Sequence, residues 1–188
     1  MCKLILLGGI PGVGKTTIAY ELARIYKIDK VLSIDILKNI IKKFIPKEQE
    51  PYLYTTTHEA HTLENLSIID GYIKHSNILN KYVIDILDTF KNEKIIILEG
   101  ATITKDILKD LKEYEVYYFN LYLEEDKDLI ERYKSKLKIR KGKWIENLDK
   151  INEINKYLIN QNVINIKSKE KEKTIKEIRR YLDENICN

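Results

Sequence analysis

The sequence Gly9-Ile10-Pro11-Gly12-Val13-Gly14-Lys15-Thr16 decides the fold, because it matches the pattern G-x-x-x-x-G-K-[ST] in the required setting. An apolar run at residues 4–7 precedes it, and an amphipathic segment at residues 17–26 follows it. The glycines let backbone N–H groups turn inward around an anion, and the start of a helix adds its positive dipole end. The sequence therefore predicts a strand, a phosphate-binding loop and a helix that together bind a nucleoside triphosphate.

The predicted nucleotide site consists of residues from this loop and the first helical turn. Lys15 can reach the β- and γ-phosphates of ATP, and the Thr16 hydroxyl can ligate Mg²⁺. A tight strand-to-helix turn with an incidental lysine is the simpler alternative, but the flanking strand and helix patterns both argue against it. The residues expected to bind the nucleotide are Gly9, Pro11, Gly12, Val13, Gly14, Lys15, Thr16 and Thr17.

Composition sets limits on the class of protein. The 188 residues are 44% hydrophobic and 33% charged, which is typical of one globular domain that covers residues 1–188. The net charge of +4 is small against 33 basic and 29 acidic residues, so a nucleic-acid partner is not expected. Two cysteines near the two ends and the lack of a long apolar run predict a reduced, cytoplasmic setting without a membrane segment.

Strand and helix patterns alternate along the chain. This order predicts an α/β fold with a five-stranded parallel sheet covered by helices on both faces, as in P-loop kinases. Functional residues are then expected at the carboxyl ends of the strands. The predicted strands are residues 3–7, 30–34, 94–98, 116–123 and 163–166, and the predicted helices are residues 17–26, 35–44, 66–90, 105–112, 125–137, 147–159 and 171–186.

Two carboxylates follow predicted strands directly. Asp35 ends the second strand and Glu99 ends the third, so both should lie near the phosphate loop. Phosphoryl transfer needs one carboxylate to orient or deprotonate the attacking hydroxyl and another to hold the surroundings of Mg²⁺. We therefore expect Asp35 to contact the acceptor and Glu99 to serve the metal. The alternative is that each side chain caps the next helix, and the two roles are compatible.

Arginine is rare in this lysine-rich chain, and two of the five arginines flank one basic segment. Arg132 and Arg140 lie around residues 138–144, which also contain Gly142. A guanidinium can bind a transferring phosphoryl group through two parallel hydrogen bonds. The pattern predicts a short lid at residues 138–146 that closes over the phosphates, with both arginines in catalysis. The alternative is a solvated basic helix end.

A polar cluster around residues 55–59 has no clear period. It indicates a substrate-binding loop in which Thr57 and Glu59 contact the acceptor, and Gly100 is expected to do so from the end of the third strand. The alternative for Thr57 is a cap on a helix that begins at His58. His58 and His61 lack a convincing third ligand, so no metal other than Mg²⁺ is expected.

Several short stretches occur in the same order as in a known family. They are residues 8–19, Ser33-Ile34-Asp35, the run that ends with Glu59-Ala60, Gly71-Tyr72, Ile97-Leu98-Glu99-Gly100, Arg132-Tyr133 and residues 151–158. In this respect the chain resembles the kinase domain of archaeal 2-phosphoglycerate kinase. The resemblance implies a fold similar to adenylate and gluconate kinases, and ATP-dependent phosphorylation of a small acidic hydroxyl compound. Ala101-Thr102 departs from the family, which usually has Val-His at this point.

Three functions are compatible with these observations. The first is a small-molecule kinase, with ATP and a small acceptor as its partners. The second is a kinase that acts on a nucleotide or an RNA end, with the basic segment at the rim. The third is a nucleotide-dependent switch without metabolic turnover. The rim carboxylates and the arginines favour the first two, and no guanine-reading Asn-Lys-x-Asp motif is present.

Overall fold

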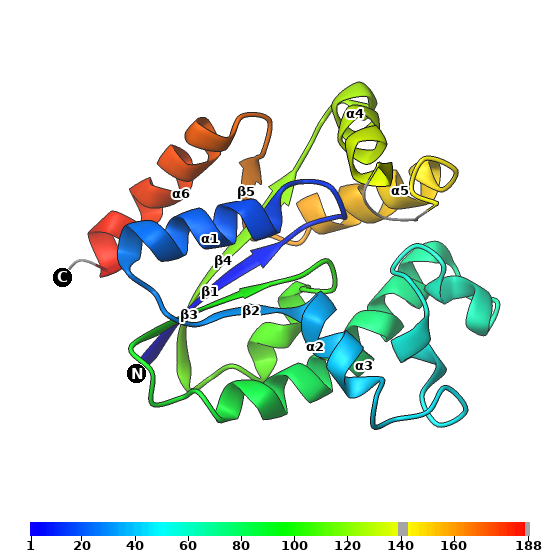
Figure 1. Ribbon diagram of the computed structural model, residues 1–188, viewed down its shortest axis with the longest axis horizontal. Coiled ribbons are helices and arrows are strands. Elements are labelled where there is room, and N and C mark those ends of the chain that lie inside the picture. Colours follow the sequence, from blue (N-terminus) through cyan, green and yellow to red (C-terminus); the bar gives the residue numbers. More distant parts are fainter. Residues whose placement is uncertain (139–142, 187–188) are drawn as a thin grey trace.

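The computed structural model describes residues 1–138 and 143–186, and within these ranges five strands form one parallel sheet. The order across the sheet is β2-β3-β1-β4-β5 (Figure 1). This arrangement confirms the predicted fold class. The strands are β1 (Cys2–Gly8), β2 (Val31–Ser33), β3 (Ile95–Glu99), β4 (Tyr114–Tyr122) and β5 (Ile164–Lys167).

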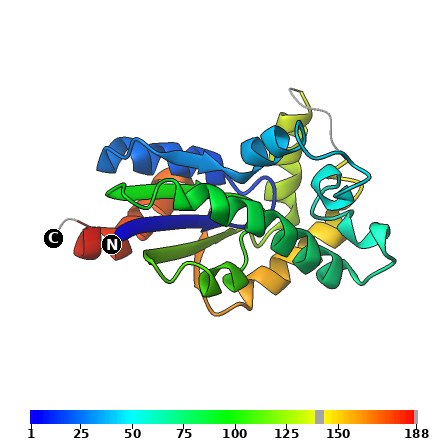
Figure 2. The same cartoon turned by 90° about the horizontal axis from the view of Figure 1, so that it is seen from below.

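Helices cover both faces of this sheet. In Figure 1, α1 and α6 lie above the strands and α3 lies below them, and α3 stands in front of the strands when the molecule is seen from below (Figure 2). The helices are α1 (Lys15–Tyr26), α2 (Ile34–Ile41), α3 (Ile68–Asp88), α4 (Asp126–Leu137), α5 (Leu148–Ile159) and α6 (Lys171–Ile186), and the 3-10 helices are η1 (Pro51–Tyr54), η2 (Ala60–Leu63) and η3 (Lys105–Lys109).

The core has two parts because successive side chains of a strand point to opposite faces. In β1, Ile5 and Leu7 pack in the cluster that contains residues of α1 and α6, whereas Leu4 and Leu6 pack in the cluster that contains residues of α3. All four side chains are fully buried. A strand buried on both faces must be apolar without alternation, which is the pattern that the sequence shows.

Local structure differs from the sequence-based expectation in three segments. Residues 105–112 contain the short 3-10 helix η3, and α2 ends at Ile41 rather than at residue 44. Pro46 follows closely, and a proline disfavours the helical conformation of the residue before it. No helix begins at His58, so the alternative in which Thr57 caps such a helix is wrong; residues 57–59 form a turn before η2.

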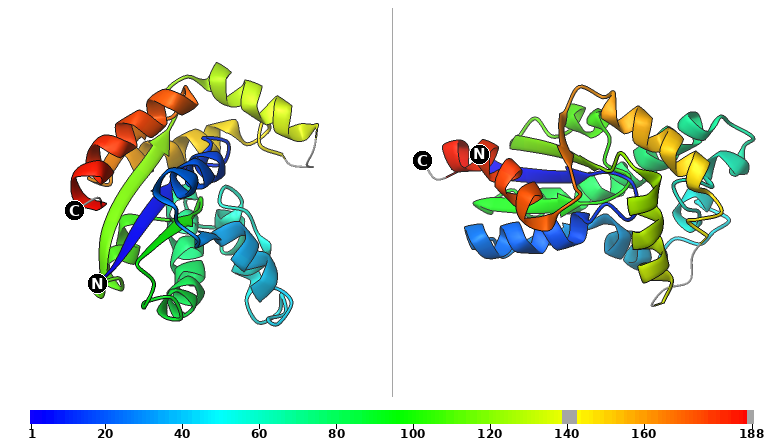
Figure 3. Two further views of the ribbon diagram at one scale, coloured as in Figure 1. Left: turned by 60° about the vertical axis from the view of Figure 1, so that its left-hand side comes forward. Right: turned by 90° about the horizontal axis from the view of Figure 1, so that it is seen from above.

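The carboxyl ends of the strands meet on one side of the molecule. Glu99 at the end of β3 pairs with Leu7 in β1 and with Ser33 in β2, and Gly8 pairs with Asn120 in β4. Helices α4 and α5 and the segment that contains η1 and η2 lie on this side, as the two views in Figure 3 show. Parallel strands therefore bring side chains from distant parts of the chain together at this edge.

Candidate active site

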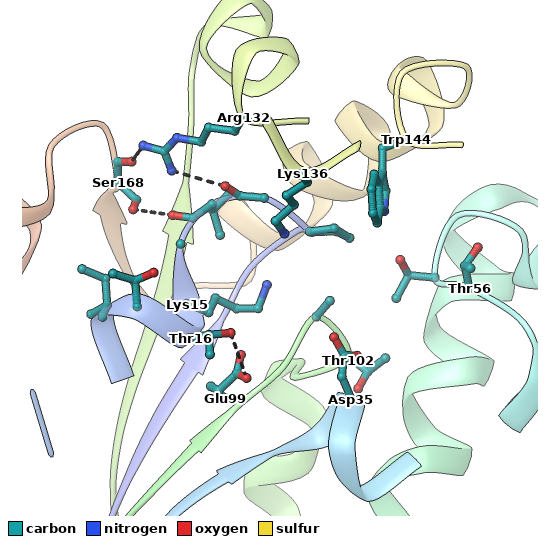
Figure 4. A pocket seen from close by; sticks show the side chains of 18 of the residues that line it. Lys15, Thr16, Asp35, Thr56, Glu99, Thr102, Arg132, Lys136, Trp144 and Ser168 are labelled. Atoms are coloured by element: carbon teal, nitrogen blue, oxygen red, sulfur yellow. Dashed lines mark hydrogen bonds between the residues drawn. The ribbon is translucent and has the colours of Figure 1, made fainter. Parts of the chain in front are cut away.

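A cavity of about 640 Å³ lies at this edge of the sheet (Figure 4). Arg132 and Ser168 lie at one end of it and Thr56 at the other, with Lys15 between them. Its size is in the range of pockets that hold small molecules and cofactors. The wall contains residues 11–18, Asp35, Lys38, Thr56, Thr57, His58, His75, Leu79, Glu99, Ala101, Thr102, Arg132, Lys136, Trp144, Ser168, Lys169 and Lys171.

The loop between β1 and α1 has a backbone conformation that leaves no room for a side chain at Gly9 or Gly12. Gly9 has φ +127°, and a Cβ atom there would lie 2.1 Å from the carbonyl oxygen of Leu121. Gly12 has φ +93°, and a Cβ atom would lie 2.6 Å from the ring of Tyr133. The Tyr133 hydroxyl donates a hydrogen bond of 2.7 Å to the carbonyl of Pro11, so α4 holds the loop from outside. Gly9 supports the loop from behind and does not line the cavity.

Lys15 is buried at the start of α1, and its Nζ donates a hydrogen bond of 2.9 Å to the carbonyl of Ile10. Burial lowers the pKa of Lys15 to about 8, and the nearby Glu99 and Asp35 carboxylates oppose this shift. A phosphate group bound beside the ammonium would favour the charged form again, because opposite charges stabilise each other. Lys15 is therefore placed as a cation that requires an anionic ligand.

Thr16 and Glu99 form a pair of oxygen donors beneath Lys15. The Thr16 hydroxyl donates a hydrogen bond of 3.1 Å to Glu99, whose side chain is buried. Mg²⁺ prefers oxygen ligands and keeps several waters, and it usually takes only one or two protein ligands beside the phosphates of a substrate. The two residues fit this ion. Within residues 1–138 and 143–186, no group of three or more His, Cys, Asp and Glu side chains could hold a metal by itself.

Asp35 lies in the first turn of α2 rather than at the end of a strand, because β2 ends at Ser33. An acidic residue in a first helical turn interacts favourably with the helix dipole. Its side chain is exposed to the cavity and lies beside Thr102 (Figure 4). The structure thus brings Asp35 to the same cavity as Lys15 and Glu99, at the side away from Arg132.

Arg132 holds backbone carbonyls in this structure. Its guanidinium donates to the carbonyls of Gly12, Ser168 and Lys169, at 3.3 Å for Gly12 and 2.9 Å for Lys169. It therefore connects the phosphate loop to the segment after β5. Its expected role on the transferring phosphoryl group stays a prediction. Arg140 and residues 139–142 of the expected lid lie outside the described residues.

Of the residues that the sequence predicts for the acceptor loop and the end of β3, only some line the cavity. Thr57 lines the cavity, whereas Glu59 and Gly100 do not. The Glu59 carboxylate accepts a hydrogen bond of 2.8 Å from Thr56, and a Cβ atom at Gly100 would lie 2.8 Å from the side chain of Ile34. Glu59 thus orders its own loop, and Gly100 permits close packing of α2 on β3.

Sequence reasoning missed several residues of the wall, and four of them make contacts that shape the site. Trp144 stacks on Tyr133 with a ring distance of 5.8 Å and forms the upper wall near Lys136 (Figure 4). The Ser168 hydroxyl donates a hydrogen bond to the carbonyl of Val13. Lys38 and His75 come from α2 and α3. Lys38 could have been found from its spacing, because residues three apart on a helix share a face and Asp35 was already a candidate.

The fold and the phosphate-binding loop define a class: the chain has the P-loop kinase fold. The gluconokinase structure from Sinorhizobium meliloti matches with a TM-score of 0.60 at 9% identity, over 97% of this chain and 94% of that chain. A shikimate kinase structure from Acinetobacter baumannii matches with a TM-score of 0.59 at 14% identity, over 99% of this chain and 96% of that chain. At these identities the likeness concerns the fold alone.

Within this class, the chain is a distant homologue of archaeal 2-phosphoglycerate kinases. It is 31% identical to that of Pyrococcus furiosus over 93% of this chain and 62% of the relative, and 27% identical to that of Methanococcus maripaludis strain C5 over 83% and 55%. The mevalonate-3-phosphate 5-kinase of Thermoplasma acidophilum is 30% identical over 68% and 64%. The chain thus spans little more than half the length of the first curated relatives that it matches.

Two further findings concern protein families and membrane helices. No protein-family model matches the chain. Among the described residues, there is no helix whose length and hydropathy would allow it to cross a membrane.

Proposed function

We propose that the chain is a single-domain kinase that transfers the γ-phosphoryl group of ATP to a hydroxyl of a small acidic metabolite, in the manner of 2-phosphoglycerate kinase. The observation that carries the proposal is the meeting of Lys15, the Thr16–Glu99 pair and Asp35 in one cavity. Each is a group that phosphoryl transfer requires, and they come from the first turn of α1, the end of β3 and the first turn of α2. The homology to small-molecule kinases supports the same conclusion.

Each residue has a distinct task in this reaction. The backbone N–H groups of the loop and the Lys15 ammonium bind the phosphates and stabilise the charge that spreads over the transferred group. Asp35 orients the acceptor hydroxyl and accepts its proton as the new P–O bond forms. Thr16 and Glu99 would hold Mg²⁺, which when bound neutralises charge on the β- and γ-phosphates. Arg132 keeps the loop in the conformation that these contacts need.

The walls of the cavity favour a small acceptor over a nucleic acid. Among the described residues, the acceptor side is lined by α2, α3 and the segment at residues 56–58, which surround a compact space that suits a small molecule. The homologous kinases act on different phosphorylated acids according to their names, 2-phosphoglycerate and mevalonate 3-phosphate. The first experiment is therefore to identify the acceptor.

A transfer screen tests the proposal. The protein is incubated with ATP, Mg²⁺ and single acceptors, and new phosphate esters are detected by ³¹P NMR. The panel contains 2-phosphoglycerate, D-glycerate, mevalonate 3-phosphate, shikimate, gluconate, nucleosides and an RNA with a free 5′-hydroxyl. We expect transfer to one of the small acids and none with Lys15→Ala. Transfer only to nucleosides or RNA, or hydrolysis of ATP without transfer to any acceptor, would refute the proposal.

A further inference from the structure

A partly buried lysine lies on the acceptor side of the cavity. Lys38 of α2 donates a hydrogen bond to the carbonyl of Thr55, and its Nζ lies 3.3 Å from Nε2 of His75 in α3. Both side chains line the cavity, and His75 is only 1% exposed. An ammonium has three N–H donors, and these two contacts account for two of them. A third N–H remains for a ligand.

The burial of Lys38 and the charges around it favour the binding of an anionic group at this position. Burial and, to a smaller extent, the charge of Lys42 at the C-cap of α2 lower the pKa of Lys38 to about 8, and Asp35 opposes the shift. Burial, together with Lys38 and Lys42, holds the pKa of His75 well below its ordinary value. At neutral pH the pair therefore consists of a neutral imidazole and an ammonium that is charged in most molecules. A cation with so little water around it is stabilised strongly by an anionic ligand.

Polar atoms near the pair also lack partners. Nδ1 of His58, Nδ1 of His75 and Oγ1 of Thr102 are buried and have no hydrogen-bond partner among the described atoms. All three residues belong to the wall of the cavity and are at least nine-tenths buried. Buried polar groups in proteins are nearly always hydrogen-bonded, so these three side chains keep hydrogen-bonding capacity that the described atoms do not use.

We propose that Lys38 determines acceptor specificity by binding the anionic group of the acceptor while Asp35 receives its hydroxyl. This inference rests on the proposed function. Asp35 and Lys38 are three residues apart on α2, so both side chains leave the same face of the helix at a separation of about 5–6 Å between Cβ atoms. That spacing fits a short acceptor whose hydroxyl is one or two carbon atoms from its anionic group. A carboxylate and a phosphate ester both have the required charge.

Substitution of Lys38 tests the proposal by steady-state kinetics. Lys38→Met keeps the length of the side chain and removes its charge, and Lys43→Met makes the same charge change at an exposed position two residues after the end of α2. We expect Lys38→Met to raise the KM of the acceptor about 10- to 100-fold, the range of a buried charge-assisted hydrogen bond. The KM of ATP should stay unchanged, and Lys43→Met should behave as the wild type. An unchanged acceptor KM in Lys38→Met would overturn the proposal.

The pH dependence gives a test that does not require the methionine variant to fold. The charged and titratable groups around Lys38 are Asp35 on α2, Lys42 at the C-cap of α2 and His75 on α3. Because Lys38 loses its proton as the pH rises through about 8, the KM of the acceptor should rise above that pH in the wild type. Lys38→Arg keeps its charge and should show no such rise. A wild-type KM that is flat from pH 7 to 10 would also overturn the proposal.

Equilibrium binding separates this inference from the proposed function. Calorimetry with D-glycerate, glycerol 2-phosphate and 2-phosphoglycerate shows whether a carboxylate, a phosphate ester or both are bound, and glycerol serves as the neutral control. Binding to the wild type and not to Lys38→Met supports the inference even if no acceptor is phosphorylated, an outcome that refutes the proposed function alone. Equal binding to both proteins, or no binding of any anion to the wild type, refutes the inference.

Discussion

Arg132 offers a sharp test of how the nucleotide site is held together. Arg132→Lys keeps the positive charge, but a single ammonium cannot reach three carbonyls that the planar guanidinium binds. Two of the three hydrogen bonds should be lost. The guanidinium is half-buried, so each bond has a value of about 1 kcal/mol, below the range for fully buried charged groups. The loss of about 2 kcal/mol corresponds to a Tm lower by about 4–8 °C for a chain of this size.

The assays are thermal unfolding and ATP binding. Binding can be followed by the fluorescence of Trp144, the only tryptophan in the chain, which lies in the wall of the cavity. We expect ATP affinity to fall about tenfold, or about 1.4 kcal/mol, because the loop loses its support. Arg24→Lys is the matched control, since the side chain of Arg24 is 76% exposed and pairs with Glu21 on the surface of α1. If kcat fell 100-fold or more while Tm and ATP affinity stayed normal, Arg132 would act on the transferred phosphoryl group instead.

Two further predictions concern the acceptor and the loop. Asp35→Asn should lower kcat at least 100-fold with little change in ATP affinity, because the amide cannot accept the proton of the hydroxyl; a collapse of ATP affinity with normal kcat would move Asp35 to the metal site. Gly12→Ala should weaken ATP binding at least tenfold more than Gly14→Ala in a fluorescence titration. Both glycines have positive φ, but a Cβ atom at Gly12 would lie 2.6 Å from Tyr133, whereas the nearest atom at Gly14 is 3.6 Å away. Equal losses would show that steric contact with Tyr133 is not the cause.

The fold could be predicted from the sequence because its main signals are local. The centres of β1 and β3 are continuous apolar runs, and the predicted ends of all five strands lie within two residues of the observed ends. The phosphate loop has its own pattern, which identifies Lys15 and Thr16, whereas Asp35 and Glu99 are predicted from strands that must end at the same edge. The segment with η1 and η2 could not be predicted, because its 3-10 turns have no hydrophobic period.

The roles of Arg132, Lys38 and His75 could not be predicted from the sequence, because they depend on contacts between residues that are far apart in the chain. Arg132 was expected at the phosphates, but its hydrogen bonds to Ser168 and Lys169 depend on how α4 packs beside the segment after β5. Lys38 and His75 are 37 residues apart, and their contact depends on the angle at which α2 meets α3. One sequence has no pattern that encodes such packing, so these roles become visible only in the folded chain.

The central claim is that this cavity transfers a phosphoryl group from ATP to a bound hydroxyl. The most direct measurement is a single-turnover reaction with γ-labelled ATP and the acceptor found in the screen, in which the label is divided between acceptor and free phosphate. The wild type should place most of the label on the acceptor, and Lys15→Ala should slow transfer by at least 1,000-fold, about 4 kcal/mol, while it keeps the folded state. Label that appears only in free phosphate, or transfer by Lys15→Ala at the wild-type rate, would contradict the account.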